Sequence, residues 1–272
     1  MNWGRIKTIL IILFLFTDIF LALSIFASQK KETEISPEVV NATVKILKEH
    51  NILVDKSVIS PKIPQASVLQ ADNVISDYFE FARLLLGDGF SQDGENTFSA
   101  EDANLTFSGD NFYFEYTLKP DIFENFTANE AQKSAFSYLK GLGFDISGAK
   151  IISSSLNGGI YRITARDYAE NMPVYSSEVD ISLSKNGVYS LSGSWFNRRV
   201  NSNAVSSLKS PASILVDFSA LYEGEPAEIK LTELGYSVYD SATYHKSASL
   251  IPVTKIQLTD GNEYFIDSRS SE

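Results

Sequence analysis

The sequence contains no cysteine, and this absence excludes several kinds of protein. Small exported domains that depend on disulfides are rich in cysteine, and a bacterial lipoprotein needs a cysteine to carry its lipid. Thiolate zinc sites and cysteine nucleophiles are excluded in the same way. For an exported chain, this composition favours the outside of a Gram-positive bacterium over an animal secretory pathway.

Histidine is also scarce, because only His50 and His245 are present. We interpret His50 as a helix-end residue, where a cation is favoured, and His245 as a surface residue rather than a catalytic one. The sequence contains no H-E-x-x-H, G-x-S-x-G, P-loop or dinucleotide fingerprint. We therefore expect no enzyme activity, no catalytic residues, no cofactor and no metal site.

Basic residues are fewer than acidic ones, 23 against 34, which gives a formal net charge of −11. Nucleic acids and anionic lipid surfaces attract basic proteins, so this balance argues against both as partners. The acidic segment from Asp88 to Glu95 lacks the alternating ligand spacing of an EF-hand and indicates a solvated loop. A hydrophobic content of 44% is nevertheless enough for a folded protein.

One long apolar run is present, from Thr8 to Ala27. At ~1.5 Å of rise per residue, a helix of this length reaches ~30 Å, the thickness of a bilayer's hydrocarbon core. Arg5 and Lys7 in the preceding head predict a cytoplasmic N-terminus. The alternative is a cleaved signal peptide, but the run is longer than the ~7–15 residues of such a segment. We predict an uncleaved, single-pass anchor in the cell membrane, with the bulk of the chain extracellular.

Asp18 lies in the middle of this run, where a carboxylate costs ~2.5–3.5 kcal/mol on insertion scales. Helices associate in lipid through packing and interhelical hydrogen bonds. Phe14, Thr17, Asp18 and Leu21 have the spacing of one helical face. We hypothesise that this face binds a partner's transmembrane helix; the alternative is a polar residue that the span tolerates.

The remainder of the chain has the pattern of an α+β protein. We expect helices near residues 37–50, 73–86, 125–140 and 210–222. Between them, hairpin signals such as Asn157-Gly158-Gly159 separate short strands, which we expect near residues 104–108, 111–118, 149–156, 159–165, 173–183, 188–195, 229–239, 249–258 and 263–267. A helix followed by antiparallel strands occurs twice, which predicts helices packed on one face of each sheet.

These patterns also predict a division of the chain. We expect a cytoplasmic head over residues 1–7, the anchor over 8–27 and a linker over 28–36. An N-terminal α+β domain would then cover 37–124, a middle helix-plus-sheet domain 125–200, and a C-terminal helix-plus-sheet domain 201–272. The polar run at residues 197–203 is the expected internal boundary.

Met1-Asn2-Trp3 and Lys7-Thr8-Ile9 lead into the apolar run, and Ile251 to Ile256 is followed by a second stretch from Asp260 to Ile266. These N-terminal and C-terminal stretches resemble those of the YycI (WalI) family. The order of anchor, linker and exterior α+β region matches over essentially the whole chain. Asp18 stands where many members carry Asn, so a polar contact is kept at this position.

The resemblance implies an accessory regulator of the WalK–WalR (YycG–YycF) two-component system of low-GC Gram-positive bacteria. Such proteins are not enzymes. They associate through transmembrane and extracellular contacts with the sensor histidine kinase WalK and the sister protein YycH, and so influence cell-wall metabolism. Self-association into a homo-oligomer is a further expectation for the chain.

Two alternatives belong to other classes of protein. A wall-associated hydrolase, anchored or secreted, would need a carboxylate pair or a metal site in a cleft. A plain extracytoplasmic binding module would have a cleaved N-terminus and would be released from the membrane.

Overall fold

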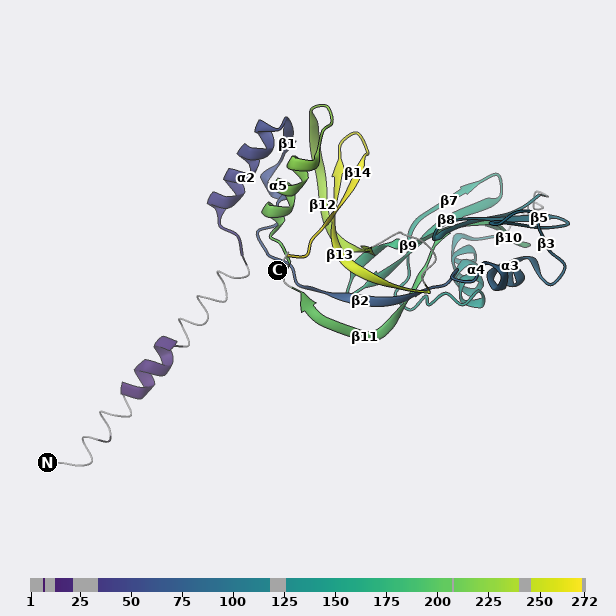
Figure 1. Ribbon diagram of the computed structural model, residues 1–272, viewed down its shortest axis with the longest axis horizontal. Helices are drawn as coiled ribbons and strands as arrows, with labels where there is room; N and C mark the ends of the chain where they lie inside the picture. Colours follow the sequence, from purple (N-terminus) through teal and green to yellow (C-terminus); the bar gives the residue numbers. More distant parts are fainter. Residues whose placement is uncertain are drawn as a thin grey trace. The chain divides into compact units, whose positions relative to one another are not determined.

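The computed structural model describes residues 7, 13–21, 34–117, 126–206, 208–239 and 246–270, with the side chains of residues 200–206 outside this description. The chain forms two compact units. The first unit comprises Met1–Gln65, Ser207–Thr232 and Lys255–Glu272, and the second comprises Ala66–Ser206 and Glu233–Thr254. Helices and a large sheet occur together (Figure 1), which confirms the expected mixed α+β class.

The second unit is built around an antiparallel sheet of consecutive hairpins. In spatial order its strands are β7 (Lys150–Asn157), β8 (Ile160–Ala169), β9 (Met172–Ser184), β10 (Gly187–Ser194), β6 (Asn111–Tyr116), β5 (Ala103–Ser108), β4 (Thr97–Ala100) and β3 (Ser91–Gln92). Gly158 and Gly159, both at positive φ, turn β7 into β8, and Glu170 and Asn171 do the same between β8 and β9. Two-residue turns of this kind suit the right-handed twist of a hairpin.

Further strands complete this unit. β2 (Ala66–Asn73) pairs antiparallel with β11 (Phe196–Ser206) and with β13 (Ser247–Leu258). β12 (Ala227–Val238) joins β9 in parallel, with Tyr236 opposite Val174. The sheet is therefore mixed, whereas the sequence predicts only antiparallel strands.

Two helices, α3 (Tyr78–Leu86) and α4 (Ala128–Gly141), cover one face of the hairpin sheet (Figure 1), α3 against β4 and β5 and α4 against β8, β9 and β10. Residues on β5 alternate between buried and exposed, as period-2 geometry requires. Leu105, Phe114 and Leu191 are fully buried beneath the helices. The opposite face of the sheet is left uncovered by these helices.

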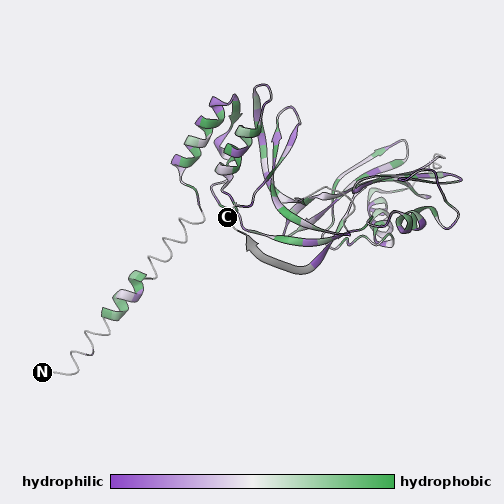
Figure 2. Cartoon of the chain, viewed as in Figure 1, coloured by the Kyte–Doolittle hydropathy of each residue, from purple (hydrophilic) through white to green (hydrophobic). Residues whose placement is uncertain are grey.

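The first unit contains α2 (Pro37–Glu49), β1 (Ile52–Val54), the short 3₁₀ helix η1 (Lys56–Val58), α5 (Pro211–Leu221) and β14 (Glu263–Asp267). β1 pairs in parallel with the start of β12. Helices α2 and α5 contact each other, and α5 is hydrophobic along much of its length (Figure 2). Its Ile214, Leu215 and Phe218 form a separate buried core with Leu47.

Several details differ from the expectations. Residue 73 does not begin a helix: β2 extends to Asn73, and α3 starts after Asp77. The Asn73 side chain accepts a hydrogen bond from Ile75 N at 3.0 Å, and the Asp77 carboxylate accepts from the first-turn amides, so local side-chain bonding ends the strand and caps a shorter helix. The polar run at 197–203 is part of strand β11 rather than a boundary.

The two compact units also differ from the three consecutive exterior domains expected over 37–124, 125–200 and 201–272. Each unit is assembled from segments that alternate along the chain. The physical reason is strand pairing between distant segments, because β2 hydrogen-bonds both β11 and β13. Strand β12 begins in the first unit and ends in the second.

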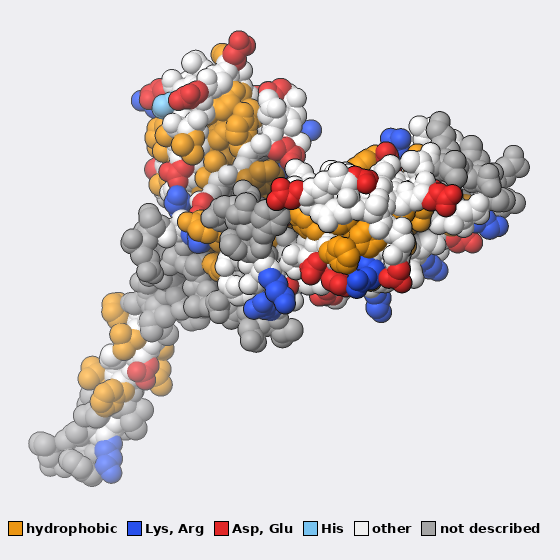
Figure 3. Space-filling view, turned by 45° about the vertical axis from the view of Figure 1, so that its right-hand side comes forward, with side chains coloured by type: hydrophobic (Ala, Val, Ile, Leu, Met, Phe, Trp, Pro, Cys, Tyr) orange, Lys and Arg blue, Asp and Glu red, His pale blue; other side chains and the backbone are white. Residues whose placement is uncertain are grey.

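The expected anchor over residues 8–27 is described only in residues 13–21, which are helical. Mainly hydrophobic side chains surround this helix (Figure 3). Within the described residues, no helix combines the length and the apolar character needed to cross a membrane. The anchor remains a prediction.

Candidate functional site

The four residues that the sequence assigns to partner binding lie within the helical residues 13–21. Phe14 is 58% exposed and Leu21 is 52% exposed, and the side chains of Thr17 and Asp18 are also exposed. The Thr17 hydroxyl donates to Leu13 O at 2.9 Å, and Asp18 is the acidic side chain of this helical face. The helix thus presents one face with two large apolar groups and a carboxylate.

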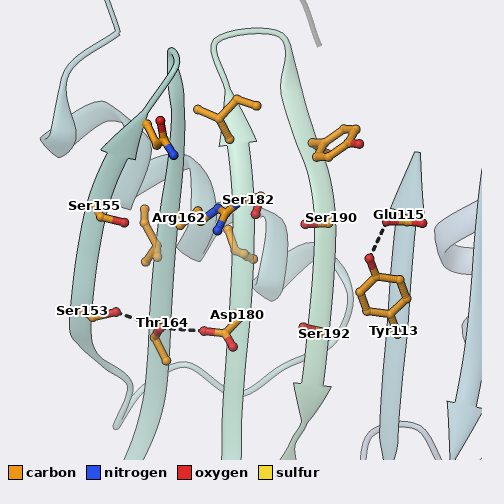
Figure 4. Close-up of a pocket in the computed structure, with 15 residues that line it drawn as sticks. Tyr113, Glu115, Ser153, Ser155, Arg162, Thr164, Asp180, Ser182, Ser190 and Ser192 are labelled. Atoms are coloured by element: carbon orange, nitrogen blue, oxygen red, sulfur yellow. Dashed lines mark hydrogen bonds between the residues drawn. The ribbon is translucent and has the colours of Figure 1, made fainter. Parts of the chain in front are cut away.

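A second candidate site lies on the uncovered face of the hairpin sheet, within the second unit. It is a hollow of about 570 Å³. Polar side chains from β7, β8, β9, β10 and β6 spread across it (Figure 4), and we call it the polar hollow. Its lining comprises Tyr113, Glu115, Ser153, Ser155, Asn157, Ile160, Arg162, Ile163, Thr164, Asp180, Ile181, Ser182, Tyr189, Ser190 and Ser192.

Strand register places the lining residues in two cross-strand rows. The first row consists of Ser155, Arg162, Ser182, Ser190 and Glu115, each opposite the next on a neighbouring strand. The second row consists of Ser153, Thr164, Asp180, Ser192 and Tyr113. At ~4.8 Å between strands, each row extends roughly 19 Å. Hairpin turns join β7 to β8, β8 to β9 and β9 to β10, and these turns fix the register of the four strands. β6 pairs with β10 from a distant part of the chain, so its register depends on the tertiary structure.

Hydrogen bonds hold the second row in place. The Ser153 hydroxyl donates to Thr164 Oγ1 at 2.8 Å, and the Thr164 hydroxyl donates to Asp180 Oδ1 at 2.6 Å. On the other side of the hollow, the Tyr113 hydroxyl donates to the Glu115 carboxylate. This hydrogen bond to Glu115 is the main reason that the pKa of Tyr113 is raised.

Charge in the hollow is carried by one cation and two carboxylates. The exposed Arg162 forms no ion pair with any residue that the structure describes. Farther along the same strand, Arg166 is paired with Glu178. Arg162 is thus a guanidinium with its donors open to solvent, between the hydroxyls of Ser155 and Ser182 in the first row. The hollow can donate and accept hydrogen bonds at closely spaced positions.

Sequence reasoning identified the strands of this face but did not recognise the polar hollow. The available signal was the alternate spacing of serines, as in Ser153 and Ser155 or Ser190 and Ser192. Alternation predicts an exposed face, but only the register shows that serines of separate strands meet. On β6, Phe112 and Phe114 are buried, whereas Tyr116 is 37% exposed.

His50 belongs to neither candidate site. His50 is the C-cap residue of α2, which confirms its expected position at a helix end, and His245 lies outside the described residues. Among the described residues, no group of three or more His, Cys, Asp or Glu side chains could hold a metal ion.

The sequence matches no protein-family model and no curated protein. Similar solved structures include the following three, each at 12% identity. An uncharacterized protein from Eubacterium rectale has a TM-score of 0.46 over 80% of this chain and 86% of its own. YycH from Bacillus subtilis has a TM-score of 0.46 over 75% of this chain and 53% of its own, so the match spans about half of that chain. The C-terminal domain of Bacillus megaterium YpeB has a TM-score of 0.32 over 71% of this chain and 91% of its own.

Proposed function

We propose that this protein is a non-enzymatic accessory regulator of the WalK–WalR two-component system, anchored in the cell membrane by residues 8–27. The N-terminal head would lie in the cytoplasm and the two compact units outside the cell. Its partners would be the sensor kinase WalK and the sister protein YycH. The observation that carries the proposal is the helical face of Phe14, Thr17, Asp18 and Leu21, whose side chains are all exposed.

A regulator of this kind would act through the free energy of binding its partner and not by catalysing a reaction. A sensor kinase exchanges between active and inactive states, and a partner shifts that equilibrium only if it binds one state more tightly than the other. Contacts by the helix and by the exterior units would therefore supply the differential affinity.

The resemblance to the YycI family is the reason that the proposal names the WalK–WalR system. The C-terminal segments that fit the YycI family fall on β13 and on the turn and strand that follow it, β14. They therefore belong to folded elements and not to a loose tail. Their similarity extends the resemblance from the apolar N-terminal run to the far end of the chain.

The proposal is tested by replacing Asp18 in the full chain and recovering partners from native membranes. We expect Asp18→Leu to reduce recovery of the histidine kinase and its accessory protein at least several-fold, because the interhelical hydrogen bond is lost. Asp18→Asn keeps hydrogen-bonding capacity and should retain most of the recovery. Equal recovery of partners with the wild-type chain, Asp18→Leu and Asp18→Asn would show that Asp18 takes no part in the mechanism.

A photo-crosslinking scan distinguishes a specific helix face from general proximity. Crosslinkers at positions 14, 17, 18 and 21 should capture the kinase or its accessory protein. Positions 16 and 19, on the opposite side of the same helix, serve as matched controls. Capture of a second copy of this chain alone would indicate self-association instead, and a mature protein that begins near Ser28 would contradict the anchor.

A further inference from the structure

Five of the ten residues in the two rows of the polar hollow are serines. Here the central positions are occupied by Ser182, Ser190 and Ser192, which are short, so the sheet is depressed between larger residues on either side. In Figure 4, Ser190 and Ser192 lie between the strand of Ser182 and Asp180 on one side and the strand of Tyr113 and Glu115 on the other.

The size and lining of the hollow narrow the class of ligand. A volume of about 570 Å³ lies within the ~300–1,000 Å³ of small-molecule sites. Most such sites are apolar, whereas hydroxyl, carboxylate and guanidinium groups predominate here. An apolar ligand would bury these groups without hydrogen-bond partners, which costs free energy for each of them. The ligand must therefore be polar over most of its surface.

The hydrogen-bonding groups of the polar hollow restrict the class of ligand further. A serine or threonine hydroxyl both donates and accepts, a carboxylate accepts, and Arg162 only donates. A complementary ligand must donate and accept at many closely spaced positions, which is the chemistry of a chain of sugar rings. The rings of Tyr113, which is 49% exposed, and of Tyr189 offer apolar faces for the C–H groups of such rings.

The charges of the hollow and of the whole chain favour a neutral saccharide over an acidic one. Arg162 faces two carboxylates, Glu115 and Asp180, in the same hollow, and the whole chain carries a net charge of −11. An anionic ligand would be repelled, while the carboxylates can accept hydrogen bonds from sugar hydroxyls. We propose that the polar hollow binds an uncharged oligosaccharide. This inference does not depend on the proposed regulatory function, because the hollow lies wholly within the second unit.

The test uses the full chain in a detergent without a sugar head group. A glycan array would be screened first. The affinities of the uncharged oligosaccharides that bind would then be measured by calorimetry and saturation-transfer NMR. N-acetylglucosamine trimer and maltotriose would be measured in the same way as defined probes. Ser190→Tyr fills the hollow with a bulky side chain at a half-buried strand position. Asn104→Tyr is the matched control, since Asn104 lies opposite Glu115 on β5 but does not line the hollow.

We expect at least one uncharged oligosaccharide to bind, Ser190→Tyr to weaken it at least tenfold, and Asp180→Asn to weaken it several-fold. Asn104→Tyr should leave the affinity unchanged, and circular dichroism should show that every variant is folded. The proposal is overturned if no uncharged oligosaccharide binds, or if Ser190→Tyr and Asn104→Tyr behave alike. Binding of acidic saccharides alone, or cleavage of the bound saccharide, would also overturn it.

Discussion

Two neighbouring arginines on β11 show how burial changes the energetic value of the same kind of interaction. Arg198 donates from Nε to Asp167 Oδ2 at 2.7 Å, and the Asp167 side chain is 2% exposed. Arg199 pairs with Asp72, and both of these side chains are about half exposed. Burial raises the pKa of Asp167 despite the guanidinium beside it. The Arg199 hydrogen bond instead lowers the pKa of Asp72.

We predict that Arg198→Ala lowers the free energy of unfolding by ~3–5 kcal/mol at neutral pH, because it leaves a buried carboxylate without its counter-charge. Arg199→Ala is the matched control and should cost ~0–1 kcal/mol, as exposed pairs do. Urea titration of both variants measures the difference. Similar losses in the two variants would contradict the role assigned to burial.

The stability loss caused by Arg198→Ala should depend on pH, because the pKa of Asp167 is raised in the folded protein. A folded-state pKa above the unfolded one means that the folded protein binds the proton more tightly, so the contribution of Asp167 to stability falls as pH rises from ~3.9 through the folded pKa. Removal of the Arg198 charge raises that pKa further. The loss caused by Arg198→Ala should therefore shrink as pH is lowered towards ~4, and it should be largest at neutral pH.

At the scale of single elements, helix α4 begins with reciprocal capping. The Thr127 hydroxyl accepts from Glu130 N at 3.3 Å, and the Glu130 carboxylate accepts from Thr127 N at 2.9 Å. Both bonds satisfy amide groups that have no partner within the helix. They fix the start of the helix, whose Ala131, Ala135 and Leu139 are buried against the sheet.

Thr127→Ala should lower the free energy of unfolding of the second unit by ~0.5–2 kcal/mol, because one capping bond is lost. Ser134→Ala removes a hydroxyl from an exposed position of the same helix, and we expect it to be neutral or slightly stabilising, since Ala favours helix. Denaturant unfolding monitored by circular dichroism gives both values. A loss in Ser134→Ala as large as that in Thr127→Ala would show that capping is not the cause.

At the scale of the whole molecule, the described residues form two separate hydrophobic cores. The core of the second unit contains 23 buried residues, including Trp195, and that of the first unit contains nine. Because hydrophobic stabilisation grows with the apolar area buried, the second unit should be the more stable of the two. Strands β12 and β13 contribute residues to both units.

We predict that the two units unfold at different denaturant concentrations. In a Trp3→Phe variant, fluorescence reports only Trp195 and therefore the second unit, whereas far-ultraviolet circular dichroism reports both units. The circular dichroism signal should begin to fall at a lower denaturant concentration than the fluorescence signal. Coincident curves would mean that the continuous strands join both cores into a single cooperative unit.

Local chemistry predicts much of this fold. The caps before α4 and α5, the glycine turn between β7 and β8 and the period-2 pattern of β5 involve residues close in sequence, so their effect can be read without the rest of the chain. Errors occur where a local signal was ambiguous. Apolar residues near 73–77 fit a helix by spacing, but Asn73 ends a strand there and Asp77 caps a later helix start.

By itself, the sequence determined the α+β class, most helices and strands, the apolar N-terminal run and the helical face that carries Asp18. Only the tertiary structure decided the pairing of β2 with β11 and β13, the interleaved units and the polar hollow. The physical reason is range: caps, turns and periodicity act over a few residues, whereas strand partners are selected by contacts between residues far apart in the chain. Serines such as Ser153 and Ser192 become one surface only when the register brings their strands together.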